Sequence, residues 1–209
     1  MCPKMYNNIL RSKLAIILLA AGEGLRLGSY PKALLEINGV PLIQRFWNEV
    51  LPLHPIECVT VLGFYAERIK NLAAQYSNVI IHPNPKLGQA SSVRLGLEAL
   101  RSDFEYLIVA LVDQPTVGIN ELNLLINYAI TLENTIDAVV PCYREQRGNP
   151  VLFKRKAIDE ILNTPDQSCR TWLDQNQNRV AFLETSLDSY VRDVDDFNDL
   201  KREGVHQPL

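Results

Sequence analysis

Three glycines and two cations lie close together near the start of the chain. Gly22, Gly24 and Gly28 flank Arg26, and Lys32 follows them. Glycines allow a backbone to turn tightly and to direct its N–H groups toward an anion. Arg and Lys add the positive charge that a phosphate chain requires. The segment therefore indicates a binding loop for a triphosphate, and a plain surface turn with solvated charges is the alternative interpretation.

The spacing of these glycines differs from two other phosphate-binding patterns. A dinucleotide-binding loop reads G-x-G-x-x-G and opens a helix, whereas this chain reads G-x-G-x-x-x-G. The next apolar run ends at Leu62-Gly63, without the acid that would bind a ribose. No Gly-Lys-Ser/Thr follows, as a P-loop requires. An NAD(P)-dependent oxidoreductase on a related fold is therefore a weaker alternative.

A carboxylate supplies the second kind of chemistry. Asp113 directly follows the apolar run Tyr106–Val112, and Pro115 shapes the loop behind it. This order places the Asp113 side chain at the carboxyl end of a predicted strand. An acid in that position can hold a divalent cation, and its alternative role is to cap a turn.

These side chains must be brought together by the elements that carry them. Apolar runs predict strands at Leu14–Ala20, Glu57–Leu62, Asn78–His82, Tyr106–Val112, Ala138–Pro141, Pro150–Phe153 and Val180–Leu183. Helical patterns, the first entered after the turn Asn38-Gly39, occupy Pro41–Leu51, Tyr65–Tyr76, Gln89–Arg101, Asn120–Leu132, Arg155–Asn163, Cys169–Asn176 and Asp196–Glu203. This alternation predicts an α/β fold with a mostly parallel sheet, which binds ligands at the carboxyl ends of its strands.

Composition narrows the classes of partner. The 209 residues carry 21 basic and 24 acidic side chains, a net charge of −3, so we expect neither nucleic acid nor a membrane surface as partner.

The apolar run Leu14–Ala21 behind Lys4, Arg11 and Lys13 resembles a signal peptide, but the glycine loop that follows favours a buried strand. No apolar run reaches the ~18 residues of a membrane span. We expect a cytoplasmic protein.

The length favours one domain. We predict an N-terminal extension over 1–13, a single domain over 14–203 and a tail over 204–209. The cysteines are too far apart for a C-x-x-C pair, and we expect reduced, structural thiols at Cys2, Cys58, Cys142 and Cys169.

Histidines and tryptophans receive structural interpretations. The spacing of the histidines fits neither a zinc site nor a catalytic triad, and we expect loop or surface positions for His54, His82 and His206. Trp47 and Trp172 lie within apolar helix patterns and are expected in the core.

Several motifs resemble one enzyme family. Leu19-Ala20-Ala21-Gly22, Arg26, Gly28 and Pro31-Lys32-Ala33-Leu34-Leu35 resemble the signature L-A-A-G-x-x-x-R-x-G … P-K-x-L-L of nucleotidyltransferases that bind an NTP. Four further segments are similar to the MobA-like NTP transferase family, especially the MocA-like molybdenum cofactor cytidylyltransferases: Gly88–Leu97, Leu111–Pro115, Arg147–Phe153 and Asp193–Asp196. The matches span about Leu14 to Leu200.

The resemblance implies a fold and a set of site residues. The fold would be the Rossmann-like three-layer sandwich of nucleotide-diphospho-sugar transferases. Catalysis would fall to Lys32, Arg26 and Asp113, and Mg²⁺ would bind Asp113 and Asp195, although Asp195 reads equally as part of an acidic helix start. The nucleotide would contact Leu19, Ala20, Ala21, Gly22, Gly24, Arg26, Lys32, Gln89, Ser91 and Ser92. The alternative for Ser91 or Ser92 is helix capping.

The implied reaction transfers a nucleotidyl group to a phosphate acceptor and releases pyrophosphate. CTP is preferred over GTP, because Ala21 stands where the guanylyl branch more often has Gly. The implied acceptor is molybdopterin or its molybdenum form, bound by Arg147, Gly148, Asn149 and, more weakly, Arg170. For Arg147-Gly148-Asn149 the alternative is an ordinary hairpin turn. A molybdoenzyme or an insertion chaperone would be the protein partner.

Departures from the family pattern leave alternatives open. Gly24 stands where Ser is usual, Ser29-Tyr30 adds one residue before Pro31, Asn149 replaces a common His, and Asp166–Arg170 departs from D-x-G-A-R. The last three differences affect the acceptor site most. The alternatives are a nucleotidyltransferase for sugar phosphates or other phosphate acceptors, and a non-catalytic nucleotide-binding protein for cofactor insertion.

Overall fold

The apolar run Leu14–Ala20 forms strand β1 in the middle of the sheet, as predicted. Every one of its side chains is buried. Strand β4 (Glu57–Leu62) pairs with it in parallel on one side, and β6 (Tyr106–Leu111) does so on the other. Because all of its side chains are buried, both faces of β1 must be covered, which explains its unbroken apolar sequence. The structure, a computed structural model, describes residues 13–208; Cys2 and the predicted extension up to residue 12 lie outside them.

The sheet order is β10-β7-β9-β6-β1-β4-β5, with β8 paired to β7. The remaining strands are β5 (Asn78–Ile81), β7 (Ala138–Tyr143), β8 (Gln146–Arg147), β9 (Val151–Lys154) and β10 (Val180–Glu184). Strand β9 runs antiparallel to β6 and β7. The connection from β7 to β9 is too short for the crossover that a parallel pair needs. The predicted mostly parallel sheet is confirmed.

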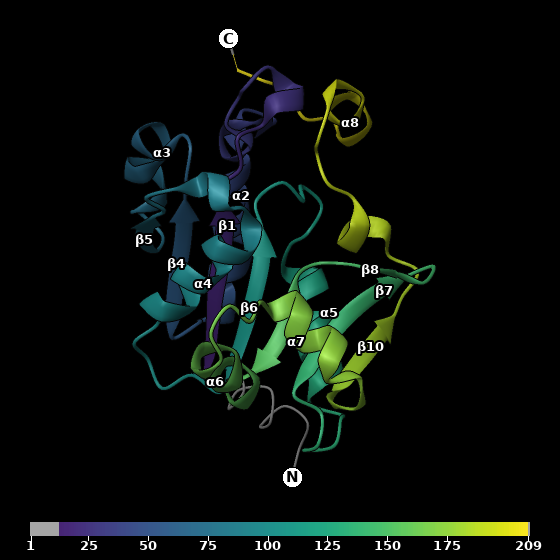
Figure 1. Ribbon diagram of the computed structural model, residues 1–209. Coiled ribbons are helices and arrows are strands. Elements are labelled where there is room, and N and C mark those ends of the chain that lie inside the picture. Colours follow the sequence, from purple (N-terminus) through teal and green to yellow (C-terminus); the bar gives the residue numbers. More distant parts are fainter. Residues whose placement is uncertain (1–12, 209) are drawn as a thin grey trace.

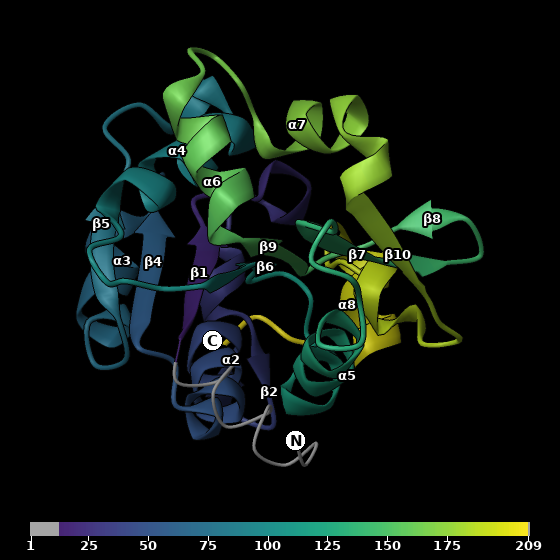
Figure 2. The same ribbon diagram turned by 90° about the horizontal axis from the view of Figure 1, so that it is seen from below.

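Helices cover both faces of the sheet (Figures 1 and 2). One layer consists of α2 (Leu42–Val50), α3 (Ala66–Ala73) and α5 (Ile119–Ala129), which pack with Ile16 and Leu18 of β1. The other consists of α4 (Gln89–Ala99), α6 (Arg155–Asn163) and α7 (Cys169–Gln175), which pack with Ile17 and Leu19. This is the predicted three-layer sandwich. Helix α8 (Phe197–Glu203) is the last helix of the described residues.

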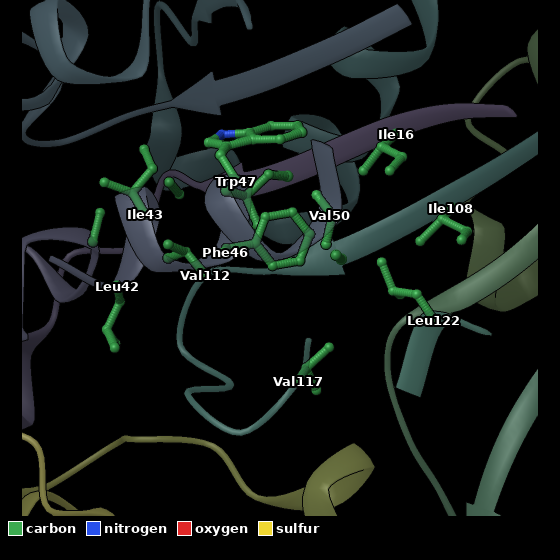
Figure 3. Close-up of a cluster of buried hydrophobic side chains, with 14 of the residues drawn as sticks. Ile16, Leu42, Ile43, Phe46, Trp47, Val50, Ile108, Val112, Val117 and Leu122 are labelled. Carbon is green, nitrogen blue, oxygen red and sulfur yellow. The ribbon is translucent and has the colours of Figure 1, made fainter. Parts of the chain in front are cut away.

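Both tryptophans lie in the core, as predicted. Trp47 packs edge-on against Phe46 with ring centroids 5.3 Å apart, and its Nε1 donates to Thr60 Oγ1. Figure 3 shows this cluster, in which side chains from α2 lie near Ile16 and Ile108 of the sheet. Trp172 is buried in the second layer. Large aromatic side chains thus anchor a helix to each face.

Short elements differ from the prediction. The turn at Asn38-Gly39 joins a small hairpin, β2 (Glu36–Ile37) and β3 (Val40–Pro41), before α2 begins. Two-residue strands are too short to show an alternating pattern, so the sequence does not reveal them. Single turns of 3₁₀ helix were likewise missed: η1 (Leu25–Leu27), η2 (Lys32–Leu34), η3 (Leu51–Leu53), η4 (Pro85–Leu87), η5 (Gln177–Arg179) and η6 (Asp188–Val191).

Two further observations concern the described chain as a whole. Cys58, Cys142 and Cys169 are free thiols, as expected, and burial raises the pKa of Cys58 and of Cys169 to about 12. A thiol with so high a pKa stays protonated and is a poor nucleophile. Within residues 13–208, none of the helices combines the length and the apolar character that crossing a membrane requires.

Candidate active site

The glycine loop follows β1 and is fixed by close backbone contacts. Gly24 has a left-handed φ of 64°, and a Cβ built on it would lie 2.2 Å from the carbonyl oxygen of Tyr30. Its own carbonyl accepts hydrogen bonds from the N–H groups of Leu27 and Ser29. Position 24 therefore requires glycine in this chain, which accounts for the departure from the usual Ser.

Two residues outside the loop hold it in place. Gly63, directly after β4, approaches Ala21 so closely that a Cβ would lie 2.4 Å from the Ala21 carbonyl oxygen. The Tyr65 hydroxyl lies 2.8 Å from the carbonyl oxygen of Glu23 and 2.6 Å from that of Ser29. This role of Tyr65 could not be predicted from the sequence, because only the fold brings the residue to the loop. The end of β4 thus supports the glycine loop rather than carrying a ribose-binding acid.

Lys32 lies between two carboxylates from distant parts of the chain. Its Nζ donates to Asp113 Oδ2 over 2.7 Å and to Asp195 Oδ1 over 2.6 Å. The Lys32 side chain is only 15% exposed. Burial lowers the pKa of Lys32, but Asp113 and then Asp195 outweigh it and hold the pKa above its ordinary value. The ammonium group therefore stays charged at neutral pH.

Arg26 approaches the same site from the solvent side. Its Nη2 donates to Asp195 Oδ2 over 2.8 Å, while its side chain remains 69% exposed. Burial raises the pKa of Asp195, but Lys32 and Arg26 outweigh this effect and lower it. Two cations from the glycine-loop region and two distant acids thus form one cluster.

Backbone contacts explain how Asp195 reaches this cluster. The N–H of Val194 donates to the carbonyl oxygen of Asp113 over 2.8 Å, which places the two acidic segments side by side. Asp196 is the N-cap of α8, and the Asp199 carboxylate accepts from the N–H groups of Asp195 and Asp196. The start of α8 is therefore capped by Asp196 and Asp199. The side chain of Asp195 takes no part in the cap and binds Lys32 instead.

Asp193 is a third acid at the site that the sequence analysis missed. Burial, and then the charge of Asp113, raise its pKa to about 6. Its Oδ1 is buried and has no hydrogen-bond partner among the described residues. The signal in the sequence was the spacing Asp193-x-Asp195, because alternate residues of an extended segment share a side.

A pocket of about 290 Å³ opens above β1 and β6. Seven predicted nucleotide-binding residues line it, namely Leu19, Ala20, Ala21, Gly22, Lys32, Gln89 and Ser92, together with Asp113. Gly24, Arg26 and Ser91 are not part of its lining. The pocket therefore joins the glycine loop, the cationic cluster and the start of α4.

Helix α4 has Gly88, whose φ is 90°, as its N-cap, and no side chain caps it. The hydroxyls of Ser91 and Ser92 both reach back to the carbonyl oxygen of Gly88. Neither serine caps the helix, so the capping alternative is wrong. Ser92 instead lines the pocket.

The predicted acceptor residues are only partly brought together. Gly148 packs on the backbone of Tyr190, where a Cβ would lie 2.5 Å from the carbonyl oxygen. That oxygen accepts from the N–H of Asn149 and from Gln114 Nε2, next to Asp113. Arg147 on β8 instead pairs with Asp174. Arg170 is exposed in the first turn of α7.

The histidines lie at loop or surface positions, as predicted, but one of them is buried. His54 and His206 are exposed, as predicted. His82 lies in the loop that follows β5 and is only 4% exposed, and its two ring nitrogens are satisfied by Asn84 and Ser91.

The acidic cluster fits a divalent cation that also binds phosphate. Within residues 13–208, no three His, Cys, Asp or Glu side chains form a ready-made metal cage. Mg²⁺ usually needs only one or two carboxylates, because substrate phosphates and water complete its shell. Asp113 and Asp195 already face one shared cation, the Lys32 ammonium, and the unpartnered Asp193 oxygen lies beside them.

The chain is similar to known proteins in sequence and in fold. The bifunctional protein GlmU of Streptococcus pyogenes is 24% identical over 178 residues, which cover 85% of this chain but 41% of GlmU. The chain thus spans less than half of that relative. The crystal structure of Rv0371c from Mycobacterium tuberculosis has a TM-score of 0.76 at 22% identity, over 91% of this chain and 97% of that one.

Two further solved structures carry ligands. The manganese complex of Rv0371c has a TM-score of 0.66 at 18% identity, over 92% of this chain and 98% of that one. A CMP:2-keto-3-deoxy-manno-octonic acid synthetase complexed with CTP has a TM-score of 0.69 at 14% identity, over 91% and 96%. At these identities the likeness shows the fold. The family model of the MobA-like NTP transferase domain matches residues 16–180, and the chain therefore belongs to the MobA-like NTP transferase family of nucleotidyltransferases.

Proposed function

We propose that the chain transfers a nucleotidyl group from an NTP to a phosphate acceptor in a reaction that depends on a divalent cation, in the first place Mg²⁺. The observation that carries the proposal is the Lys32 ammonium between Asp113 and Asp195, beside a pocket lined by the glycine loop. A fixed positive charge and two carboxylates beside the glycine loop support the proposal, because backbone N–H groups and a positioned cation suit phosphates.

The residues of the chain divide the work between binding and charge neutralisation. The loop Ala20–Gly22 binds the phosphate chain in the pocket, and Gln89 and Ser92 contact the nucleoside. Lys32 and Arg26 turn toward the phosphates and stabilise the charge that develops on them. Asp113 and Asp195 would hold the divalent cation, which when bound supplies Lewis-acid stabilisation of the phosphate oxygens.

The proposed reaction is a direct displacement. An oxygen of the acceptor phosphate forms a bond to the α-phosphorus, the bond from that phosphorus to the bridging oxygen breaks, and pyrophosphate leaves with the electron pair. No covalent enzyme intermediate is required. The enzyme contributes by holding two anions together and neutralising their repulsion.

The identity of the NTP and of the acceptor is proposed from similarity to known proteins. Ala21 resembles the cytidylyl branch, and one structural relative is complexed with CTP, so we propose CTP before GTP. The acceptor we propose is molybdopterin or its molybdenum form, bound by Arg147, Gly148 and Asn149, with Arg170 as a further anion contact. A cytoplasmic location and a molybdoenzyme or insertion-chaperone partner belong to the same proposal.

The test is a pyrophosphate-release assay that crosses four NTPs with molybdopterin and several sugar phosphates, with Mg²⁺, with Mn²⁺ and without metal. Release with CTP and molybdopterin supports the whole proposal. Release only with sugar phosphates overturns the acceptor and keeps the activity. NTP binding without release under any acceptor overturns the activity and favours a non-catalytic insertion protein. Binding of a nicotinamide cofactor in a parallel titration would point to an oxidoreductase.

A further inference from the structure

A buried histidine connects the two segments that line the nucleoside end of the pocket. His82 follows β5 and is 4% exposed. Its Nδ1 accepts a hydrogen bond from the N–H of Asn84 over 3.1 Å, and its Nε2 contacts Ser91 Oγ. Because Nδ1 is an acceptor, the neutral ring carries its proton on Nε2 and donates it to Ser91. The ring thus links the loop after β5 to the first turn of α4.

The groups beside this link face the nucleotide pocket. Pro85 and Gly88, from the loop that His82 begins, line the pocket, and Gln89 and Ser92 flank Ser91 on α4. Ser91 itself lines a different cavity, of about 620 Å³, together with His82. Ser91 therefore acts on the pocket through its neighbours in the helix rather than by contact.

The triphosphate end of the pocket is built independently of His82. The glycine loop is supported by Gly63 and Tyr65, and Lys32 is held by Asp113 and Asp195. None of these contacts involves the loop after β5 or the start of α4. A change at His82 is thus expected to alter one half of the nucleotide site and spare the other.

We propose that His82 is a positioning residue for recognition of the nucleoside. Through Asn84 and Ser91 it fixes the loop after β5 and the first turn of α4, and it thereby orients Gln89 and Ser92 toward base and ribose. The inference rests on the proposed function, since it requires that the pocket binds a nucleotide.

The test compares CTP with inorganic tripolyphosphate as ligands in calorimetric titrations of the full chain. Ser91→Ala removes the partner of His82 at a helical position that favours alanine. His82→Asn keeps an acceptor for Asn84 but cannot reach Ser91. We expect both variants to weaken CTP binding about five- to tenfold, the effect of one lost hydrogen bond, and to bind tripolyphosphate as the wild type does. In turnover, KM for CTP rises and kcat is retained.

Two further variants separate positioning from simple stability. His82→Gln places an amide donor within reach of Ser91 and is expected to restore most of the CTP affinity, whereas the double variant His82→Asn/Ser91→Ala is no weaker than either single one. His54→Asn is the control, because His54 is exposed and its left-handed φ of 55° suits asparagine.

The outcomes are distinguishable. Folded variants that bind CTP as tightly as the wild type overturn the inference and leave the proposed function intact. An equal loss of tripolyphosphate binding also overturns it, because the role of His82 is then general stability. A wild-type chain that binds no NTP overturns the proposed function and the inference together.

Discussion

Lys32 Nζ and Asp113 Oδ2 lie 2.7 Å apart although 81 positions separate the two residues in the sequence. Both side chains are largely buried, at 15% and 21% exposure. A charge in such a place is costly without its partner. The pair therefore contributes to the fold as well as to the proposed chemistry, and the effect of a substitution in it must be separated into these two contributions.

Replacing the lysine tests the catalytic role. Lys32→Ala is expected to lower pyrophosphate release by about two to three orders of magnitude, since a positioned charge next to the transferring group is lost. Circular dichroism checks that the fold persists. Lys70→Ala is the control, because Lys70 pairs with Glu67 on the surface of α3. Turnover by Lys32→Ala at the wild-type rate would refute the assignment.

Removing the acids tests the cation site. Asp113→Asn and Asp195→Asn are each expected to weaken Mn²⁺ binding at least about tenfold, because a carboxylate ligand becomes a neutral amide. Titration followed by electron paramagnetic resonance measures free Mn²⁺ directly. Chelation with EDTA is expected to abolish pyrophosphate release, and added Mg²⁺ to restore it. Asp103→Asn, an exposed site, is the control; equal Mn²⁺ binding by all four proteins would contradict the proposed site.

The lowered pKa of Glu57 predicts that the free energy of unfolding depends on pH. Burial raises the pKa of Glu57, but hydrogen bonds from Ser102 and from the N–H of Arg101 outweigh it and lower the pKa below its ordinary value. A lowered carboxyl pKa contributes stability above the unfolded value near 4.5, and this is lost as the pH falls through the folded value.

The corresponding variant is Glu57→Gln. Because Glu57 is only half-buried, we expect a loss of about 1 kcal/mol at pH 7 that disappears under acidic conditions below both pKa values. Urea unfolding at several pH values measures it. Glu133→Gln, at an exposed position, is expected to show no such trend, and a pH-independent loss at Glu57 would exclude the electrostatic explanation.

The glycine loop gives a prediction about backbone geometry. Gly24→Ala introduces a Cβ that collides with Tyr30, in addition to the strain of a left-handed φ. We expect nucleotide affinity to fall about tenfold or more, because the loop must shift. Gly39→Ala carries the same kind of strain at φ 76° without a neighbour within 4 Å. It is expected to cost about 1 kcal/mol of stability and to leave nucleotide affinity unchanged, as equilibrium binding of a fluorescent NTP would show.

The main elements and much of the site could be predicted from local sequence. Strands β1 and β6 are unbroken apolar runs, and the glycines and cations that follow β1 indicate a phosphate-binding loop. The choice between a ligand role and a helix-start role for Asp195 could not be made from sequence, because it depends on Asp196 and Asp199 taking over the cap. The partner of Arg147, the Asp174 carboxylate, is a long-range contact. The loop position of His82 agrees with the prediction, but its burial could not be predicted, because its hydrogen-bond partners are brought to it by the fold.

The backbone hydrogen bond from Val194 to Asp113 has a consequence for folding. The site draws on the beginning, the middle and the end of the domain, so the phosphate loop acquires its full set of charges only after the segment around Asp195 has docked. A ligand that needs both acids binds only molecules in which the segment around Asp195 has docked. In the proposed function the nucleotide is such a ligand, and by mass action it would stabilise completed chains over partly folded ones.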